Sequence, residues 1–173
     1  GAAYVRNDFA AQAAFFRRDT DNLIDYVKFD EAALWEAQNF AALATSGVEI
    51  NMTQKFTLSG LDQTLSMGYT YIDDAIKDTQ VPFSRYAINS LKHQLTANTQ
   101  IRLASHWPMS LSYRYLERTN GISYQVLDAA LRYETPKITW SLVGNNILDA
   151  QFFETNLVPA PGANVLFSMT YQY

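Results

Sequence analysis

The residues that could carry chemistry are few and scattered. The chain has two histidines, His93 and His106, and no cysteine. Both histidines fall in or beside expected connections between strands, so we interpret them as loop or turn residues and not as metal ligands. The sequence shows no Gly-x-Ser-x-Gly nucleophile motif and no glycine-rich phosphate loop. It therefore predicts a protein that is not an enzyme, with no catalytic residue, no cofactor and no metal.

The charged residues also exclude some classes of partner. Asp73, Asp74 and Asp78 could suggest calcium, but the segment lacks the glycine and the terminal glutamate of an EF-hand loop. We expect a solvated acidic loop there. The formal net charge is −4 and the basic residues are scattered. This charge pattern argues against a nucleic-acid partner.

The elements that must position any functional residue are strands. Eight segments alternate apolar and polar residues, which is the pattern of a strand with one apolar face. They are residues 9–18, 46–56, 64–71, 94–103, 110–115, 127–134, 138–143 and 165–173. The connections are long, short, long, short, medium, short and long, which is typical of an up-and-down membrane barrel. An even strand count would place both chain ends on the periplasmic side.

Two orientations of the apolar faces are open. A soluble barrel of the lipocalin kind points its apolar face inward, whereas a membrane barrel points it toward lipid. Tyrosines end several apolar faces, and the polar faces are rich in Ser, Thr, Gln and Asn but poor in Lys and Glu. These tyrosines are Tyr71, Tyr115, Tyr133 and Tyr173. Such rings are stabilised at membrane interfaces, so we favour a transmembrane barrel.

In a membrane barrel the polar faces would line the lumen. The charges that fall on these faces are Arg18, Glu49, Arg102, Arg114, Asp128, Arg132 and Glu134. Arg114 is well placed to lie near Asp128 or Arg102, because the strands that carry them are neighbouring hairpins. Such charges either link neighbouring strands of the wall or contact a ligand.

Several local patterns occur in a characteristic order. They are Phe15-Phe16-Arg17-Arg18-Asp19 with Asn22-Leu23-Ile24, Asn39, Gly47-Val48-Glu49, Asn145-Asn146-Ile147-Leu148-Asp149 with Phe152-Phe153, Pro161-Gly162 and the terminal Tyr173. With them the whole chain resembles the C-terminal part of TonB-dependent outer-membrane receptors. Ile147-Leu148, where that family has Leu-Phe, is a mild departure. Residues 86–93 are most similar to cobalamin-receptor relatives of the Bacteroidetes type.

The resemblance implies an all-β fold, in which residues 1–173 form the last eight antiparallel strands of a 22-stranded barrel in the bacterial outer membrane. It also implies import of a scarce nutrient such as cobalamin, siderophore-bound iron or haem. The implied partners are outer-membrane lipid, a plug domain and the remaining strands, the TonB energy-coupling protein through the missing part, the barrel-assembly machinery and a possible surface lipoprotein. The resemblance further implies that the plug domain lies outside these 173 residues.

An alternative is a self-standing eight-stranded outer-membrane barrel with a structural or adhesive role, since that strand number can close by itself. Such a barrel would be complete at this length and would not bind nutrients.

The resemblance assigns ligand capture to outer loops and plug. The aromatic candidates on the ligand side are Tyr26, Phe29, Trp35, Phe83, Tyr86, Phe152 and Phe153. By the same resemblance, Phe167, Met169, Tyr171 and Tyr173 form the signal read by the barrel-assembly machinery. Residues 30–46 have helical propensity and are expected to form a short helix in the first outer loop.

Overall fold

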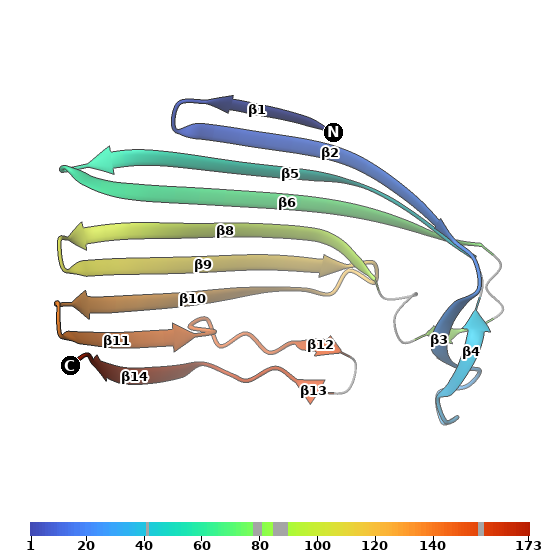
Figure 1. Cartoon of the computed structure of the whole chain (residues 1–173). Helices are drawn as coiled ribbons and strands as arrows, with labels where there is room; N and C mark the ends of the chain where they lie inside the picture. The colour runs from blue at the N-terminus through green and yellow to red at the C-terminus, as the bar shows by residue number, and fades with distance from the viewer. Residues whose placement is uncertain (41, 78–80, 85–89, 156–157) are drawn as a thin grey trace.

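A single curved antiparallel sheet forms most of the molecule (Figure 1). The computed structural model describes residues 1–173 except 41, 78–80, 85–89 and 156–157. Within this described part the main sheet has nine strands, which follow one another in sequence order. They are β1 (Ala2–Arg6), β2 (Phe9–Thr20), β5 (Ala42–Leu58), β6 (Leu61–Lys77), β8 (Leu91–Ala104), β9 (Trp107–Arg118), β10 (Ser123–Glu134), β11 (Ile138–Asn145) and β14 (Asn164–Tyr171).

The all-β antiparallel fold class is confirmed, because each of the eight segments with period-two alternation coincides with a strand of this sheet, except that residues 172–173 of the last segment lie beyond the end of β14. β1 is a ninth strand that the alternation did not reveal, since Ala2–Arg6 is short and carries little pattern. The number of strands in the main sheet is therefore odd. As a result, the start of β1 and the end of β14 do not lie at the same end of the sheet. The expectation that both ends lie on one side was wrong.

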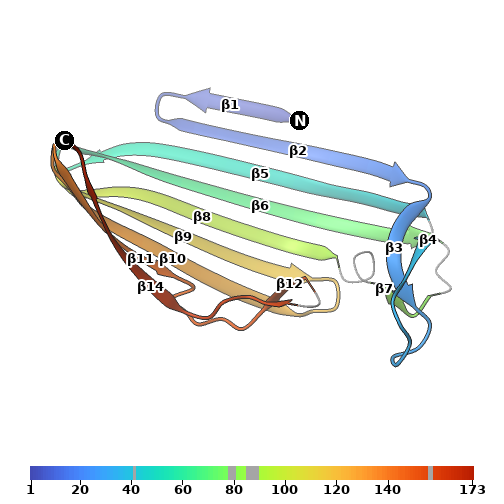
Figure 2. The ribbon, with the colours of Figure 1, turned by 60° about the horizontal axis from the view of Figure 1, so that its bottom comes forward.

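The long connections carry small strands of their own. Between β2 and β8 lies a three-stranded sheet, which we call the outer sheet, in the order β4-β3-β7 (Figure 2). Its strands are β3 (Leu23–Lys28), β4 (Glu36–Phe40) and β7 (Phe83–Ser84), and the last long connection holds β12 (Phe153–Thr155) and β13 (Val158–Pro159). The expected helix over residues 30–46 was wrong, because β4 pairs with β3 and this pairing overrides a weak helical propensity.

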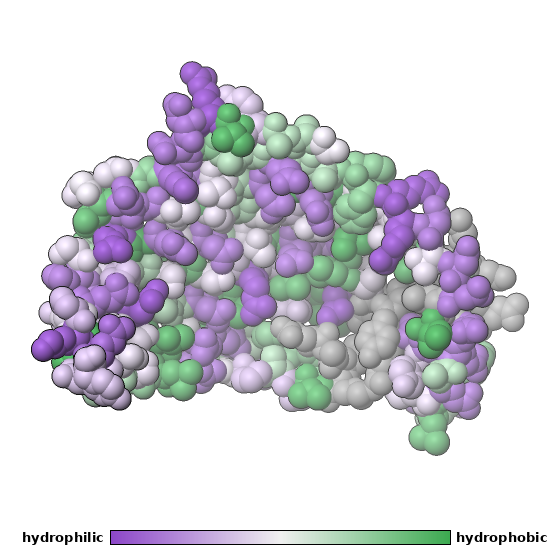
Figure 3. Space-filling model, viewed as in Figure 1, coloured by the Kyte–Doolittle hydropathy of each residue, from purple (hydrophilic) through white to green (hydrophobic). Residues whose placement is uncertain are grey.

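The short turns follow the chemistry of their residues. β5 and β6 meet at Ser59-Gly60, where both residues have positive φ, 54° and 77°. This is the backbone that a two-residue hairpin needs, because its twist matches that of the flanking strands. These turns lie together at the left in Figure 1, and hydrophilic residues gather over the same end in Figure 3.

The sheet remains open in the described part of the chain. β1 pairs only with β2, and β14 pairs only with β11. A self-standing closed barrel would require these two edges to pair with each other. Within the described residues, the sheet therefore has an unpaired edge on either side.

The apolar face is neither enclosed nor packed into a core. Among the described residues, the buried hydrophobic side chains are Val27, Val126 and Phe152, whereas Phe15 and Phe167 are 69% and 68% exposed. A soluble domain of this length would bury a sizeable core. Within the described ranges, no helix is long and apolar enough to cross a membrane.

Aromatic side chains form two bands on the apolar face. Near the turn ends, the ring centroids of Trp107 and Tyr133 lie 4.9 Å apart, and those of Tyr171 and Tyr173 lie 5.9 Å apart. Toward the loop ends, the His93 ring contacts those of Tyr69 and Tyr71, and the Tyr69 hydroxyl is 2.8 Å from His93 Nδ1. Paired aromatic bands are typical of a sheet that meets both membrane interfaces.

Gly47, in β5, has no space for a side chain. A Cβ atom there would overlap the Phe16 ring and the Tyr71 carbonyl oxygen. The carbonyl belongs to the β5–β6 ladder and cannot move aside freely. We expect Gly47→Ala to lower the free energy of unfolding by about 1–3 kcal/mol, measured by urea titration of the refolded protein in lipid vesicles.

The matched control for this substitution is Gly68→Ala, on the same face of β6. A Cβ atom there would meet only side-chain oxygens, Thr96 Oγ1 at 2.8 Å and Asn51 Oδ1 at 2.9 Å. Both groups can rotate away, so the loss should be smaller. Equal losses at the two glycines would contradict a steric role for Gly47.

Candidate functional site

The strand register places the predicted lumen charges on one face. Glu49 lies opposite Thr70, Thr70 opposite Gln94, and the same face continues through Arg114 to Val126 on β10. Followed across the sheet, these pairs carry Arg18, Glu49, Arg102, Arg114, Asp128, Arg132 and Glu134 on the same side. Alternation alone was enough to predict this grouping.

The structure divides these charges into separate groups. Arg114 Nη2 lies 4.0 Å from Asp128 Oδ2, whereas Arg102 Nη1 donates to the carbonyl of Ser105. Of the two expected neighbours of Arg114, Asp128 is therefore the one that it meets. Three other charges line a pocket of about 560 Å³ at the turn end of the sheet, namely Arg102, Arg132 and Glu134.

The motif Asn145-Asn146-Ile147-Leu148-Asp149 forms a tight corner after β11. Asn146 has a left-handed backbone with φ 47° and is 5% exposed. Its Nδ2 donates to the carbonyls of Ala150 at 3.0 Å and Pro161 at 3.1 Å, and its Oδ1 accepts from the Ala150 amide at 2.9 Å. One side chain thus joins both ends of the connection to β14.

Further hydrogen bonds attach this corner to the wall. The Asn146 amide donates to Asp128 Oδ1 at 2.8 Å, and the Ile147 amide donates to the Leu127 carbonyl at 2.8 Å. Asp149 Oδ1 accepts from the Ala163 amide at 2.9 Å. We call residues 147–155 and 158–163 the strap; they lie between β11 and β14 in the chain, and Phe152 packs on Tyr124 at the polar face.

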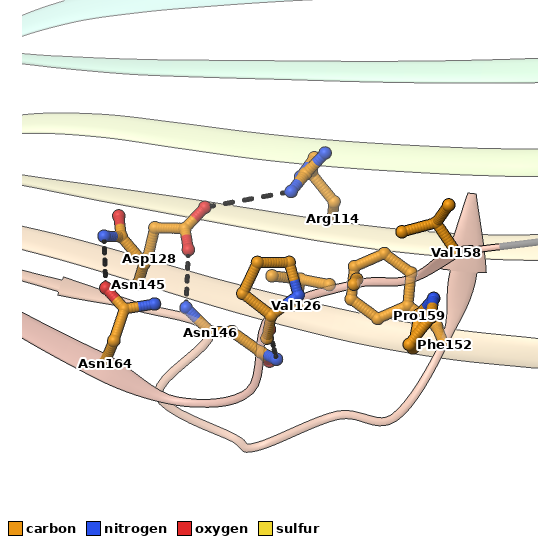
Figure 4. A pocket seen from close by; sticks show the side chains of 11 residues that line it. Arg114, Val126, Asp128, Asn145, Asn146, Phe152, Val158, Pro159 and Asn164 are labelled. Atoms are coloured by element: carbon orange, nitrogen blue, oxygen red, sulfur yellow. Dashed lines mark hydrogen bonds and ion pairs between the residues drawn. The ribbon is translucent and has the colours of Figure 1, made fainter. Parts of the chain in front are cut away.

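A pocket of about 520 Å³ lies between the strap and the wall of β9 and β10 (Figure 4). Its lining residues are Arg114, Val126, Asp128, Asn145, Asn146, Phe152, Val158, Pro159, Ala160, Pro161 and Asn164. Sites for small molecules usually combine apolar walls with a few convergent polar groups, in volumes of about 300–1,000 Å³. This pocket, which we call the strap pocket, has both properties.

The aromatic candidates fall into two places. Four of them belong to the outer sheet and its connections, namely Tyr26, Phe29, Trp35 and Phe83. There Lys28 Nζ lies 5.3 Å from the centroid of Trp35 and 5.1 Å from that of Phe83. Tyr86 lies outside the described residues.

Phe152 and Phe153, on the strap, differ in environment. Phe152 is 8% exposed and stacks on Tyr124 of β10, with centroids 4.3 Å apart and planes at 14°. Phe153 is half-exposed. Neighbours in the chain thus point in different directions, and only Phe152 lines the strap pocket.

Sequence reasoning missed the buried Asp25 in β3. It is 1% exposed, accepts from Ser84 Oγ of β7 at 2.5 Å and from the Tyr26 amide at 2.6 Å. Through its hydrogen bond with Ser84, this carboxylate links β3 to β7 in the outer sheet. In the sequence Asp25 resembles any polar loop residue, so no local signal could have revealed it.

The acidic residues of β6 do not form a shared cation site. Asp73 and Asp74 are consecutive in a strand and therefore point to opposite faces. Asp74 accepts from Thr45 Oγ1 at 2.6 Å, while Asp78 lies outside the described residues. The expected solvated loop was wrong for Asp73 and Asp74, since the strand extends past them. No cluster of three or more potential metal ligands occurs in the described segments.

Comparison with known proteins agrees with this architecture. Residues 1–147 match the family described as TonB dependent receptor-like, beta-barrel. No curated protein matches the chain.

Solved structures show the same fold at low identity. The FrpB iron transporter from Neisseria meningitidis has a TM-score of 0.70 at 16% identity over 98% of this chain and 30% of its own. The siderophore receptor PiuA from Acinetobacter baumannii has a TM-score of 0.69 at 19% identity, and the match covers 98% of this chain and 27% of PiuA. The ferric-catecholate import receptor Fiu from K12 E. coli has a TM-score of 0.62 at 18% identity, and the match covers 94% of this chain and 25% of Fiu.

The chain thus spans between a quarter and a third of the length of these structures. The family is one of outer-membrane receptors and transporters. From the family match, the antiparallel meander and the fold likeness together, this chain belongs to the TonB-dependent receptor family, in its β-barrel domain.

Proposed function

We propose that residues 1–173 are the C-terminal part of the barrel of an outer-membrane receptor that imports a scarce nutrient. Iron carried by a siderophore is the first candidate, because the similar structures are described as an iron transporter and as siderophore or ferric-catecholate receptors. Cobalamin and haem are the other candidates. The chain itself would contribute wall and loops, with no catalytic role.

The observation that carries this proposal is the open sheet with one polar and one apolar face. Its unpaired edges, β1 and β14, need further strands to complete a barrel. Its polar face carries charges and the strap, as expected for the lining of a wide lumen. An eight-stranded barrel has little room for such a loop inside.

The remaining partners belong to the same proposal. Receptors of this family have a plug domain and interact with TonB, so we propose that the plug fills the space beside the polar face. The apolar face would meet outer-membrane lipid. Phe167 and Met169 of β14 share that face with Tyr171, and with Tyr173 they would be read by the assembly machinery.

Uptake by the full-length receptor tests the function. In a bacterial host without its own siderophore receptors, the receptor should support uptake of radioactive iron from at least one siderophore or haem, or of cobalamin. Deletion of the TonB gene should return uptake to background, because import through a plugged barrel depends on energy coupling. Failure with every nutrient class, in a receptor shown to be folded at the surface, would overturn the proposal.

A further inference from the structure

The net charge of the chain is concentrated in one hairpin. Residues 21–40, which contain β3 and β4, carry five acidic residues and one lysine, so their formal charge is −4. The rest of the chain carries 12 acidic and 12 basic residues and is neutral. The negative charge of the whole chain therefore belongs to the outer sheet and its connections, at one end of the molecule (Figure 1).

One face of the outer sheet exposes large apolar side chains. Ile24 and Tyr26 of β3 are 70% and 43% exposed, and Phe83 of β7 is 37% exposed. Phe83 pairs with Lys28, which lies two residues after Tyr26 in β3. Because side chains alternate along a strand, all three apolar residues lie on the same face. We call these three residues the outer patch.

Membrane lipid does not account for the exposure of the outer patch. Tyr71, in the aromatic band near the loop ends, pairs with Val48 of β5. From Val48, β5 extends six residues further to its end at Ala42, which is about 20 Å along the strand. The outer sheet adjoins that end of β5 (Figure 2). The outer patch therefore lies outside the bilayer that the two aromatic bands mark.

Carboxylates lie at both ends of the strand that carries the outer patch. Asp21 precedes β3, whereas Asp30 and Glu31 follow it, and all three residues are exposed. The lysine of the hairpin, Lys28, has its Nζ 5.3 Å from the centroid of Trp35 and donates to the Glu31 carbonyl. These contacts hold the ammonium group within the hairpin. The field around the outer patch is therefore negative.

We propose that the outer patch binds an extended segment of another protein, in which basic and apolar residues alternate. The apolar side chains of this segment lie against Tyr26 and Phe83. Its lysines or arginines lie near Asp21 at one end of β3 and near Asp30 and Glu31 at the other.

The size and charge of the surface favour this occupant over others. β3 has six residues and is about 20 Å long, so an occupant that reaches the carboxylates at both ends is longer than a small solute. Anionic solutes and phosphate-bearing lipid surfaces are repelled by the same carboxylates. Exposed apolar groups with a polar rim are typical of protein interaction sites. Such binding is independent of nutrient import.

Binding of short synthetic peptides to the full-length receptor in phosphatidylcholine nanodiscs measures this interaction by fluorescence anisotropy. A peptide of alternating lysine and tyrosine should bind, with empty nanodiscs as the blank. Peptides of alternating glutamate and tyrosine, or of lysine and serine, should bind at least about tenfold more weakly. The first of these lacks the positive charge, and the second lacks the apolar side chains.

Two variants separate the contribution of charge from that of apolar contact. The double variant Asp30→Asn/Glu31→Gln should weaken binding of the lysine–tyrosine peptide by roughly three- to tenfold at low salt. At about 1 M salt, where the Debye length is about 3 Å, the double variant and the parent should bind alike. Tyr26→Ser should weaken binding by about tenfold at both salt concentrations, because it removes an apolar contact.

Asp8→Asn/Asp62→Asn is the matched control, because it removes two exposed carboxylates at the turn end of the main sheet. It should leave peptide affinity within about twofold. Heat-dependent gel mobility establishes that each variant is folded. Three results would each overturn the proposal: no binding of the lysine–tyrosine peptide to the folded receptor, equal binding of the glutamate–tyrosine peptide, or equal losses in the two double variants. The first of them would mean that another part of the receptor covers the outer patch.

Discussion

Replacing Asn146 by alanine should release the strap from the wall while leaving the main sheet assembled. The substitution removes the side-chain hydrogen bonds to Ala150 and Pro161, and it places alanine at φ 47°. Each lost bond costs roughly 1 kcal/mol, and a left-handed alanine costs about 1–2 kcal/mol. With three side-chain bonds lost and the backbone cost added, opening of the strap should become easier by roughly 4–5 kcal/mol.

Limited proteolysis measures this opening. Chymotrypsin cleaves after aromatic residues, and Phe152 is protected by its packing on Tyr124. Because cleavage follows the population of the open form, roughly 4–5 kcal/mol should accelerate cleavage by about three orders of magnitude. Urea unfolding of the sheet should change little in the same variant.

Two controls separate the causes of the effect. Asn146→Gly keeps the left-handed backbone and loses only the side-chain bonds, so its cleavage rate should be intermediate. Asn145→Ala removes the single side-chain bond to Asn164 at an exposed position and should be nearly neutral. If cleavage of Asn146→Ala stays at the parent rate, Asn146 does not hold the strap.

Replacing Phe167 by lysine should strongly impair insertion of the full-length receptor into lipid. Phe167 lies on the apolar face of β14, where its ring stacks on Trp140 with centroids 5.4 Å apart. A lysine facing lipid near the middle of the bilayer costs about 2–4 kcal/mol. Refolding from urea into lipid vesicles measures this cost in the absence of assembly machinery.

Ser168→Lys is the decisive control. Ser168 is the next residue in β14, pairs with Ser141 and lies on the polar face. Its lysine would meet water, so the loss should stay below about 1 kcal/mol. Phe167→Leu measures the loss of the ring alone. If Ser168→Lys reduces the free energy of insertion more than Phe167→Lys does, the apolar face does not point to lipid.

The sequence by itself determined eight of the nine strands of the main sheet and the face on which each of their residues lies. A period of two is a local property, so the side of the sheet on which Arg18 or Glu134 lies follows from counting along each strand. Turns such as Ser59-Gly60 are equally local, because positive φ depends on the residues themselves. A period of two needs several residues to be recognised, so β1, with five residues, was not predicted.

Only the tertiary structure decided the open edges, the outer sheet and the strap pocket. Asn146 joins Ala150 to Pro161, and Asp25 joins β3 to β7, through side-chain hydrogen bonds. No repeating pattern in the sequence predicts which residues these side chains meet. The choice of Asp128 over Arg102 as the partner of Arg114 likewise depends on side-chain directions across two strands. Such contacts form where the connecting loops pack against the sheet. The alternation of apolar and polar residues along a strand does not predict how those loops pack.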